Sequence, residues 1–440
     1  MRRLNVYTIC LVLGLSILLI INIGSQYAYY LTSIEHRRNI RIIIKVEDGE
    51  DSYTQQIPIA LNDDSHGLTN RDIIPIVMNE NIASGGIKNI STSAIHRSTD
   101  INKILEKART KIKEELTNYN FSRSNVTGLE DLVMESGGQP LRTLIISSWR
   151  SGSTFFGDLI NAVPSNYYHY EPLLMFGTKQ IRELEEAKEA LRMIKQMFKC
   201  NFDGLENYFE FESQDPNLFS HSTRLFDYCK DGNKTELCYN AEFVSRLCKL
   251  YPFQSMKLVR FRLKLVEEIL NDKTLNVKVI LLVRDPRGLM QSRRHRHFCE
   301  LSPDCWEPPL VCGDLTSDYV AAQHIKHNYP DRLMVIRFED LTLKPNKTTD
   351  RILQFLKLDG RQAFDRFLQK HTTVEVAGVH STFKVSRNIP FKWKHALDFS
   401  YVSKLQVACR EAMRLWGYKL AHNETHMTSY DFDPIEVYKI

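Results

Sequence analysis

The sequence carries almost no excess charge: 58 Lys and Arg residues against 53 Asp and Glu residues leave a formal net charge of +5 over 440 residues. An excess this small gives no general case for binding nucleic acid, so any argument from charge must be local. No Cys-x-x-Cys pair occurs among the nine cysteines. Because that spacing is typical of structural zinc sites, we predict disulfides ahead of metal, and neither a metal site nor a nucleic-acid partner.

Of two motifs typical of nucleotide-dependent enzymes, one is missing and the other occurs only in an unsuitable place. The sequence has no GxxxxGK[ST] motif, in which a lysine binds the terminal phosphates of a nucleoside triphosphate and a serine or threonine binds magnesium. A DxD pattern of the kind that holds a metal ion occurs at Asp431-Phe432-Asp433, near the C-terminus and outside any strand-loop context. These absences argue against a kinase and against a metal-dependent glycosyltransferase.

One long apolar run is present, and it lies at the N-terminus. Val6–Ile23 follows Arg2 and Arg3 and is just long enough to cross a bilayer as a helix. A cleaved signal peptide would need a shorter apolar region and a cleavage site of small residues, so we predict an uncleaved anchor over residues 6–30. The two arginines predict that residues 1–5 are cytoplasmic and that the rest of the chain is lumenal.

Sequons and cysteines agree with this topology. Six Asn-x-Ser/Thr sequons occur, all after the apolar run: Asn89, Asn120, Asn125, Asn233, Asn346 and Asn423. Each one alone is weak support, because such triplets also arise by chance. Cys10 lies in the predicted anchor and the other eight cysteines follow it, which is compatible with four disulfides in an oxidising compartment.

Residues 31–138 are polar, contain few aromatic residues, and are predicted to form a stem rather than a packed domain. Within this region, Ser98–Leu116 has a helical pattern with one apolar face made of Ile101, Ile104, Leu105, Ala108, Ile112 and Leu116. A lone surface helix is the simplest interpretation. A coil that joins two copies into a homodimer is the alternative, although it would span less than three heptads.

From residue 139 to 440, apolar runs typical of buried strands alternate with stretches at helical spacing. The strand candidates are Leu141–Ser148, Val277–Val283 and Leu333–Phe338, and the helix candidates are Thr154–Val163, Leu263–Leu270, Asp350–Leu356 and Ser403–Leu415. The alternation predicts an α/β domain with a P-loop-like, mostly parallel sheet flanked by helices. Ligands bind such sheets where the carboxyl ends of strands meet the following loops.

The first loop of interest is Trp149-Arg150-Ser151-Gly152-Ser153-Thr154, between a predicted strand and a predicted helix. Free backbone N–H groups and the helix dipole make such a junction suited to an anion. Gly152 allows close approach of the backbone, the hydroxyls are donors, and Arg150 supplies positive charge. Taken alone, the pattern is equally typical of an ordinary strand-helix turn.

The second loop is Arg284-Asp285-Pro286-Arg287-Gly288, which ends the predicted strand Val277–Val283. An arginine at the end of a buried strand needs a partner, which could be an anionic ligand or a structural carboxylate such as Asp285. Pro286 ends the strand and begins a helix that brings Ser292 back toward the same edge.

Together, the two loops resemble those of a known family. Residues 149–155 resemble the 5′-phosphosulfate loop of the Golgi carbohydrate sulfotransferases, and residues 282–293 (LVRDPRGLMQSR) resemble their 3′-phosphate motif. The order of the motifs matches the branch that sulfates the 6-hydroxyl of galactose, N-acetylglucosamine or N-acetylgalactosamine. Three C-terminal features are also similar to that branch: Ser386-Arg387-Asn388, Trp393 and Cys409–Tyr418. The chain departs from the family at Trp149, where Thr is usual, and at Thr154, where Ser is commoner.

The resemblance implies transfer of a sulfuryl group from PAPS (3′-phosphoadenylyl sulfate) to a sugar hydroxyl of a glycan or glycosaminoglycan, with no metal. It also implies a single-pass type II protein of the Golgi membrane with a lumenal catalytic domain. Arg150, Ser153 and Thr154 are expected to hold the 5′-phosphosulfate, and Arg284 and Ser292 the 3′-phosphate. The wider donor-binding set adds Trp149, Ser151, Gly152, Phe155, Asp285, Pro286 and Arg287.

Besides Arg150, catalysis requires a base to take the proton of the attacking hydroxyl. The resemblance points to Glu171 in Tyr170-Glu171-Pro172-Leu173, because the family carries a Glu-Pro pair shortly after the first loop. An ion-pairing or helix-capping carboxylate is the alternative interpretation of Glu171, and His169 is the rival base.

The basic run Arg293-Arg294-His295-Arg296-His297 directly follows the second motif. Solvated charge is the ordinary interpretation of such a run, and attraction of an anionic glycan is the functional one. A lumenal glycan-binding receptor without catalysis, or another lumenal nucleotide-dependent transferase, remains the alternative to a sulfotransferase.

Overall fold

The computed structural model describes residues 43–46, 53–56, 87–215, 220–230, 232–294, 296–372 and 389–440. The predicted anchor at residues 6–30 and the Ser386-Arg387-Asn388 stretch lie outside these ranges. Among the helices described, none has the length and apolar character needed to cross a bilayer. The chain divides into two compact units, Met1–Ala83 and Ser84–Ile440. In the first unit, strand β1 (Ile43–Val46) pairs antiparallel with β2 (Tyr53–Gln56).

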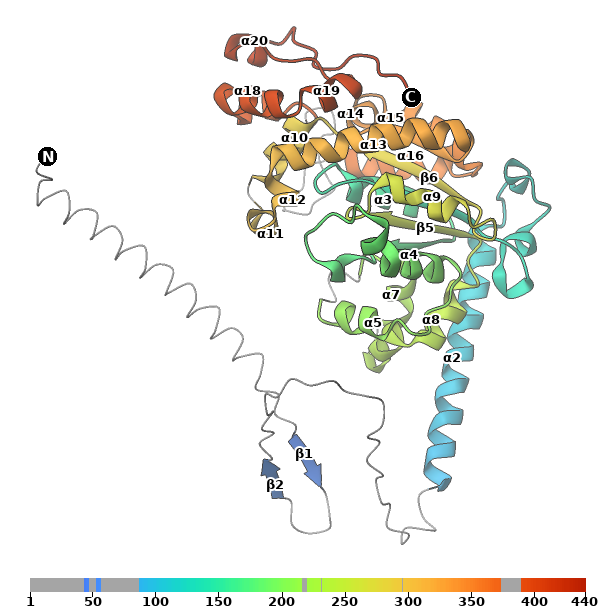
Figure 1. Cartoon of the computed structure of the whole chain (residues 1–440). Helices are drawn as coiled ribbons and strands as arrows, with labels where there is room; N and C mark the ends of the chain where they lie inside the picture. The colour runs from blue at the N-terminus through green and yellow to red at the C-terminus, as the bar shows by residue number, and fades with distance from the viewer. Residues whose placement is uncertain are drawn as a thin grey trace, which may run out of the picture. The chain divides into compact units, whose positions relative to one another are not determined.

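The second unit is built on a five-stranded sheet in the order β4-β5-β3-β6-β7, in which every neighbouring pair is parallel. Its strands are β3 (Leu141–Ile146), β4 (Asn166–Tyr170), β5 (Phe253–Leu258), β6 (Val277–Val283) and β7 (Leu333–Arg337). Figure 1 shows helices on either side of this sheet. The predicted α/β domain with a mostly parallel sheet is confirmed.

Three of the five strands were predicted, and two were not. β3, β6 and β7 are continuous apolar runs, as expected for strands covered on both faces. The missed strands contain polar side chains inside the sheet: β4 reads NYYHY, and the fully buried β5 reads FQSMKL. Those polar residues need specific partners, which an apolar pattern cannot reveal.

Helices follow the strands and pack against the sheet. The helices before β6 are α2 (Ile87–Glu115), α3 (Ser153–Asn161), α4 (Leu184–Phe198), α5 (Glu206–Ser213), α7 (Thr223–Cys229), α8 (Ala241–Cys248) and α9 (Glu267–Leu270). Those between β6 and β7 are α10 (Pro286–Arg293), α11 (His297–Glu300), α12 (Pro303–Trp306) and α13 (Pro308–Asn328). Those after β7 are α14 (Phe338–Leu343), α15 (Pro345–Leu356), α16 (Arg361–Thr372), α17 (Trp393–Ala396), α18 (Phe399–Ala408), α19 (Arg410–Leu415) and α20 (Glu424–Thr428).

The second half of α2 contains the amphipathic helix that was expected in the stem. Its apolar face is buried in the main hydrophobic core of the second unit, from Ile101 to Leu116. Near its end, Glu115 forms a two-point contact with Arg224, at 2.6 and 2.9 Å, and accepts hydrogen bonds from Ser165. The helix is therefore part of the compact unit rather than a lone surface helix, and the face from Ile101 to Leu116 that was considered for a stem homodimer is buried within that unit.

The eight cysteines after the predicted anchor form four disulfides, as their even number allowed. The pairs are Cys200–Cys248, Cys229–Cys238, Cys299–Cys305 and Cys312–Cys409. The first three close short or moderate loops, and the fourth joins α13 to the start of α19. Cross-links of this kind stabilise the fold mainly by restricting the unfolded chain.

Candidate active site

The first predicted loop joins the end of β3 to the start of α3, so it lies at the carboxyl edge of the sheet. Two of its residues have left-handed backbone conformations, Arg150 with φ +66° and Gly152 with φ +89°. A Cβ atom placed on Gly152 would come within 2.4 Å of the Phe338 ring, so only glycine fits there. The helix begins directly after this turn with no side-chain cap, so its first N–H groups have no partner within the helix, as an anion site requires.

Some predicted donor-binding residues of this loop instead have structural side chains. The Ser151 hydroxyl is buried and donates to the Ser148 carbonyl over 2.7 Å. The Trp149 ring is buried in a small cluster with Val259 and the Cys299–Cys305 disulfide. These two side chains brace the loop, and their place in the donor-binding set stays a prediction. Ser153, Thr154 and Phe155 form the first turn of α3, where backbone N–H groups lack partners within the helix, as the predicted anion site requires.

The second motif meets the first at the same edge. Arg284 follows β6, and its Nη1 donates to the carbonyl oxygen of Arg150 over 2.7 Å. The Nε of Arg150 in turn donates to the hydroxyl of Ser292 on α10 over 3.1 Å. The guanidinium of Arg284 also lies over the Phe338 ring, 4.6 Å from its centroid. Arg150, Arg284 and Ser292 therefore converge on one place, as the sequence predicted.

The positive charge at this place has no ion-pair partner among the described residues. Burial, together with the positive charges of Arg296 and Arg284, lowers the pKa of Arg150 to about 10. Burial also lowers the pKa of Arg284, although Glu339 and Asp285 oppose that effect. Among the described residues, neither Arg150 nor Arg284 forms an ion pair, and the buried Nε of Arg284 has no hydrogen-bond partner. Buried, still charged arginines with a free donor fit a bound phosphate or sulfate.

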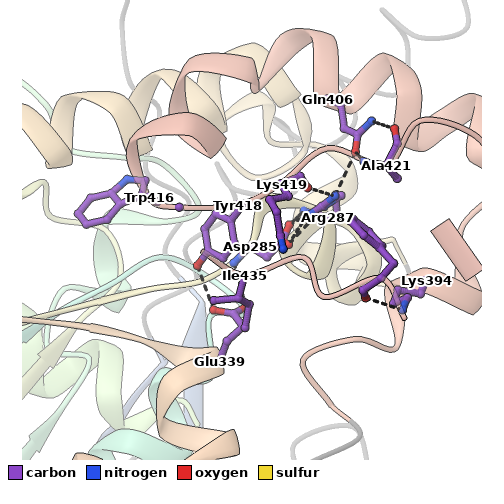
Figure 2. Close-up of polar contacts among 12 residues, drawn as sticks. Asp285, Arg287, Glu339, Lys394, Gln406, Trp416, Tyr418, Lys419, Ala421 and Ile435 are labelled. Atoms are coloured by element: carbon purple, nitrogen blue, oxygen red, sulfur yellow. Dashed lines mark hydrogen bonds and ion pairs between the residues drawn. The ribbon is translucent and has the colours of Figure 1, made fainter. Parts of the chain in front are cut away.

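Asp285 and Arg287 form no hydrogen bond with the Arg150, Arg284 or Ser292 side chains in the part of the chain that the structure describes, and their place in the donor-binding set stays a prediction. Arg287 is fully buried and forms a two-point ion pair with Asp285, whose carboxylate also caps α10. Figure 2 shows the guanidinium reaching the C-terminal segment, where it donates to Gln406 Oε1 at 3.0 Å and to the Lys419 carbonyl at 2.9 Å. It also lies 4.0 Å from the centroid of the Trp393 ring. Arg287 therefore fastens the C-terminal segment to α10, and Pro286 starts that helix.

Phe338 and Glu339, at the end of β7, were missed by the sequence analysis. Phe338 touches both Gly152 and Arg284, and so lies beneath both loops. Glu339 accepts from the Asp285 N–H at 3.0 Å and from the Tyr418 hydroxyl at 2.9 Å, the latter contact visible in Figure 2. Burial raises the pKa of Glu339 to about 7, and the nearby Asp285 carboxylate adds to the rise. The position of Phe338 and Glu339 at the end of a predicted parallel strand was the sequence feature that could have identified them as site residues.

Arg293, the first residue of the basic run, is not solvated, which corrects the interpretation of that residue. It is only 1% exposed. Its guanidinium donates to the Trp149 carbonyl at 2.8 and 3.0 Å, to the Cys305 carbonyl at 2.8 Å and to the Ser148 hydroxyl at 3.2 Å. Arg293 therefore holds the backbone immediately before Arg150.

Glu171, the predicted base, follows β4 and has φ +43°. Its carboxylate contacts Lys257 Nζ at 2.5 Å and Arg260 Nη1 at 2.7 Å. Burial alone would raise the pKa of Glu171, but the two cations outweigh burial and lower it. Glu171 is therefore an ionised carboxylate in an ion-pair network, which agrees with the alternative interpretation and leaves a role as base open.

Lys257 is a third functional candidate that the sequence analysis missed. It is fully buried near the end of β5, where its Nζ lies 3.9 Å from the centroid of the Tyr170 ring. Arg260 joins this group to the first loop, because its guanidinium lies 5.6 Å from the centroid of the Trp149 ring. Apolar neighbours on both sides of Lys257, Met256 and Leu258, were the only local signal, and the pairing that buries this charge comes from the tertiary structure.

His169, the rival base, points away from this network. Its ring stacks near Phe202 and lies edge-on to Phe198, and burial lowers its pKa to about 3. The side chains of His169 and Tyr170 alternate along β4, so they face opposite sides of the sheet. A base must reach its proton, and the position of His169 makes it the weaker candidate.

A family model described as "Sulfotransferase domain" matches residues 140–417. The chain belongs to the sulfotransferase family. This sulfotransferase is 27% identical over 347 residues to carbohydrate sulfotransferase 4 of Mus musculus, covering 68% of this chain and 87% of the relative. It is 25% identical over 345 residues to carbohydrate sulfotransferase 3 of Homo sapiens, covering 68% of this chain and 71% of the relative. Among solved structures, the sulfotransferase domain from the Synechococcus PCC 7002 olefin synthase is 17% identical, with a TM-score of 0.34, and covers 61% of this chain and 94% of that one.

Proposed function

We propose that this sulfotransferase transfers the sulfuryl group of PAPS to a sugar hydroxyl, the 6-hydroxyl of galactose, N-acetylglucosamine or N-acetylgalactosamine in a glycan or proteoglycan chain. One observation carries the proposal: the hydrogen bonds Arg284–Arg150 and Arg150–Ser292 bring the two anion-binding motifs together. A donor with a phosphate at each end of one nucleotide matches two such sites. The names of the similar proteins, all carbohydrate sulfotransferases, support a sugar as acceptor.

In this proposal, the chain's own residues divide the work between donor and acceptor. Arg150 and the first N–H groups of α3 hold the 5′-phosphosulfate, and Arg284 with Ser292 holds the 3′-phosphate. The donor supplies the sulfuryl group when it is bound. Glu171 takes the proton of the sugar hydroxyl as its oxygen bonds to sulfur, and Arg150 stabilises the charge that builds on the departing phosphate oxygen. Lys257 and Arg260 keep Glu171 ionised for this step.

The proposed setting is the lumen of the Golgi, with the chain held by a single N-terminal anchor in type II orientation. Its support is the apolar run at residues 6–23, the six sequons that follow it, and the four disulfides. Fluorescence microscopy of the tagged full-length chain tests the compartment. Digestion of intact vesicles by protease tests the orientation, because a lumenal domain is protected.

Two measurements test the proposed reaction. Full-length protein in detergent should be retained on immobilised PAP, and a glycan receptor without a donor site should pass through. The retained protein should then move radiolabelled sulfate from PAPS to chondroitin, keratan or an acceptor that ends in N-acetylglucosamine, and digestion of the product should place the label on a 6-hydroxyl. Failure to bind PAP would contradict the proposal that PAPS is the donor. Label at another position would contradict only the proposal that the acceptor is a 6-hydroxyl.

A further inference from the structure

After α10, the chain forms a short arm that contains α11 and α12 and is closed by the Cys299–Cys305 disulfide. We call residues 294–306 the basic arm; Figure 1 shows its two helices at one end of the helical layer beside α10 and α13. The arm carries the part of the basic run that the donor site does not use. Its position and its surface chemistry suggest what it binds.

The basic arm is anchored directly to the first anion-binding loop. Arg293, just before the arm, donates to the Cys305 carbonyl and to the Trp149 carbonyl, and so ties the far end of the arm to the residue before Arg150. Trp149 itself packs against the disulfide. On the other side, Asp304 accepts from the Gln180 N–H at 2.6 Å and from Arg182 at 2.7 Å. The arm therefore has a defined position at the rim of the donor site.

The outer surface of the arm combines apolar and positively charged side chains. Leu301 is 95% exposed and Phe298 is 41% exposed, although both are large and apolar. Arg294 and His297 are also exposed. Of the acidic residues on the arm, Asp304 is engaged by Arg182, and Glu300 lies 3.5 Å from His297. An exposed aromatic ring on the same short arm as arginines that form no ion pair among the described residues suits an acidic sugar, since the ring can pack on its C–H face while guanidinium groups bind its anionic group.

Arg296 links this surface to the catalytic arginine. Its Nε atom is buried and has no hydrogen-bond partner in the part of the chain that the structure describes, and no ion pair of Arg296 occurs there. Its charge is close enough to Arg150 to help lower the pKa of that residue. Arg150 and Arg296 have no ion-pair carboxylate within the described ranges, which favours a second anion beside the donor, since the proposed function already assigns the second phosphate to Arg284 and Ser292.

We propose that Arg296, with Arg294 and Phe298, forms an acceptor subsite that binds an acidic sugar of the glycan, one that carries a carboxylate or a sulfate next to the residue to be modified. This inference rests on the proposed function and deepens it: the acceptor chain is acidic, and its charge is recognised beside the donor site. The arm provides the charge, and the disulfide fixes its distance from Arg150.

The test compares two ligands that differ only in charge: unsulfated chondroitin oligosaccharides and the same oligosaccharides with their carboxylates reduced to alcohols. Binding to full-length, PAP-loaded protein is measured by calorimetry at low salt, so the result does not depend on turnover. We expect the wild type to bind the acidic form roughly tenfold more tightly, and this preference to shrink as salt is added. Equal binding of the two forms would overturn the proposal.

The variants are Arg296→Ala, Arg296→Lys and Phe298→Ala. The control is Lys188→Ala, which removes an exposed positive charge on α4, outside the basic arm. Arg296→Ala should abolish the preference for the acidic form, Arg296→Lys should keep part of it, and the control should change nothing. Phe298→Ala should weaken binding of both forms. If Arg296→Ala instead weakens PAP binding and leaves the acidic preference intact, Arg296 belongs to the donor site. A protein that binds PAP but sulfates no sugar would contradict the proposed function, whereas the charge preference would still report on the subsite.

Discussion

The Nε of Arg150 donates a hydrogen bond to the hydroxyl of Ser292 over 3.1 Å, although the two residues are 142 positions apart in the chain. Arg150 comes from the loop after β3, and Ser292 from the last turns of α10 after β6. Because β3 and β6 are neighbouring parallel strands, their carboxyl ends lie side by side, and the contact joins the two motifs into one site.

Arg150→Ala should reduce kcat/KM for sulfuryl transfer by about 10²- to 10³-fold, because it removes the charge nearest the departing phosphate oxygen. Folding should be close to normal, since Arg150 forms no ion pair in the described residues and its left-handed backbone is held by Arg293. Steady-state rates and a thermal melt are the two measurements. A large drop in melting temperature with normal turnover per folded molecule would mean that Arg150 is structural.

Arg284→Ala should raise the KM for PAPS by about tenfold or more and leave the KM for the glycan nearly unchanged, because a phosphate contact contributes to donor binding in both ground and transition states. Arg287→Ala is the matched control, three positions along the chain. It removes one partner of a buried ion pair and should lower stability by about 3 to 5 kcal/mol. Arg284→Ala should therefore change mainly the KM for PAPS, and Arg287→Ala should change mainly the unfolding midpoint. An unchanged donor KM in Arg284→Ala would remove Arg284 from the site.

If Glu171 is the base, Glu171→Gln should lower kcat by about 10²- to 10⁴-fold while PAP binding stays near the wild-type value. The variant leaves the buried Lys257 without its carboxylate, so stability will also fall, and kcat must be counted per folded molecule. His169→Ala serves as the control and should keep its turnover. The assignment is wrong if His169→Ala, and not Glu171→Gln, eliminates turnover with donor binding intact.

Glu339 should make stability depend on pH. Its pKa is raised from 4.5 to about 7 in the folded protein, so the folded state binds this proton more tightly than the unfolded state does. The contribution of Glu339 to the free energy of unfolding is therefore largest below pH 4.5. It decreases by about 3 kcal/mol as the pH rises from 4.5 to 7 and stays constant at higher pH. Denaturant unfolding at several pH values measures this slope. Glu339→Gln should remove about 3 kcal/mol of the change in stability between pH 4.5 and 7, and an unchanged pH dependence would contradict the prediction. Two other carboxyls with a raised pKa, Asp158 and Glu212, are common to both proteins.

The arrangement of the site could be predicted only in part. The placement of Arg150 and Ser292 followed from local patterns, because a strand, a turn and a helix position their residues wherever the strand lies in the sheet. The packing of the Trp149 and Ser151 side chains could not be predicted, because the local sequence of a loop does not determine whether a side chain points toward a ligand or into the protein interior. Lys257 and Arg293 were missed or misread because their partners, Glu171 and the Trp149 carbonyl, come from distant parts of the chain.

The sequence alone determined the class of fold, three of the five strands and the position of the two anion-binding loops, since apolar runs and turn residues act locally. Only the tertiary structure showed which of two arginines, Arg284 or Arg287, lies against the first loop. The two residues are three positions apart in the chain. Arg284 lies toward the first loop, and its Nε has no hydrogen-bond partner among the described residues; Arg287 lies toward the C-terminal segment with its guanidinium bound to Asp285. The reason is physical: the role of a buried guanidinium depends on the groups that surround it, and folding brings those groups from the loop after β3, from α18 and from the segment after α19.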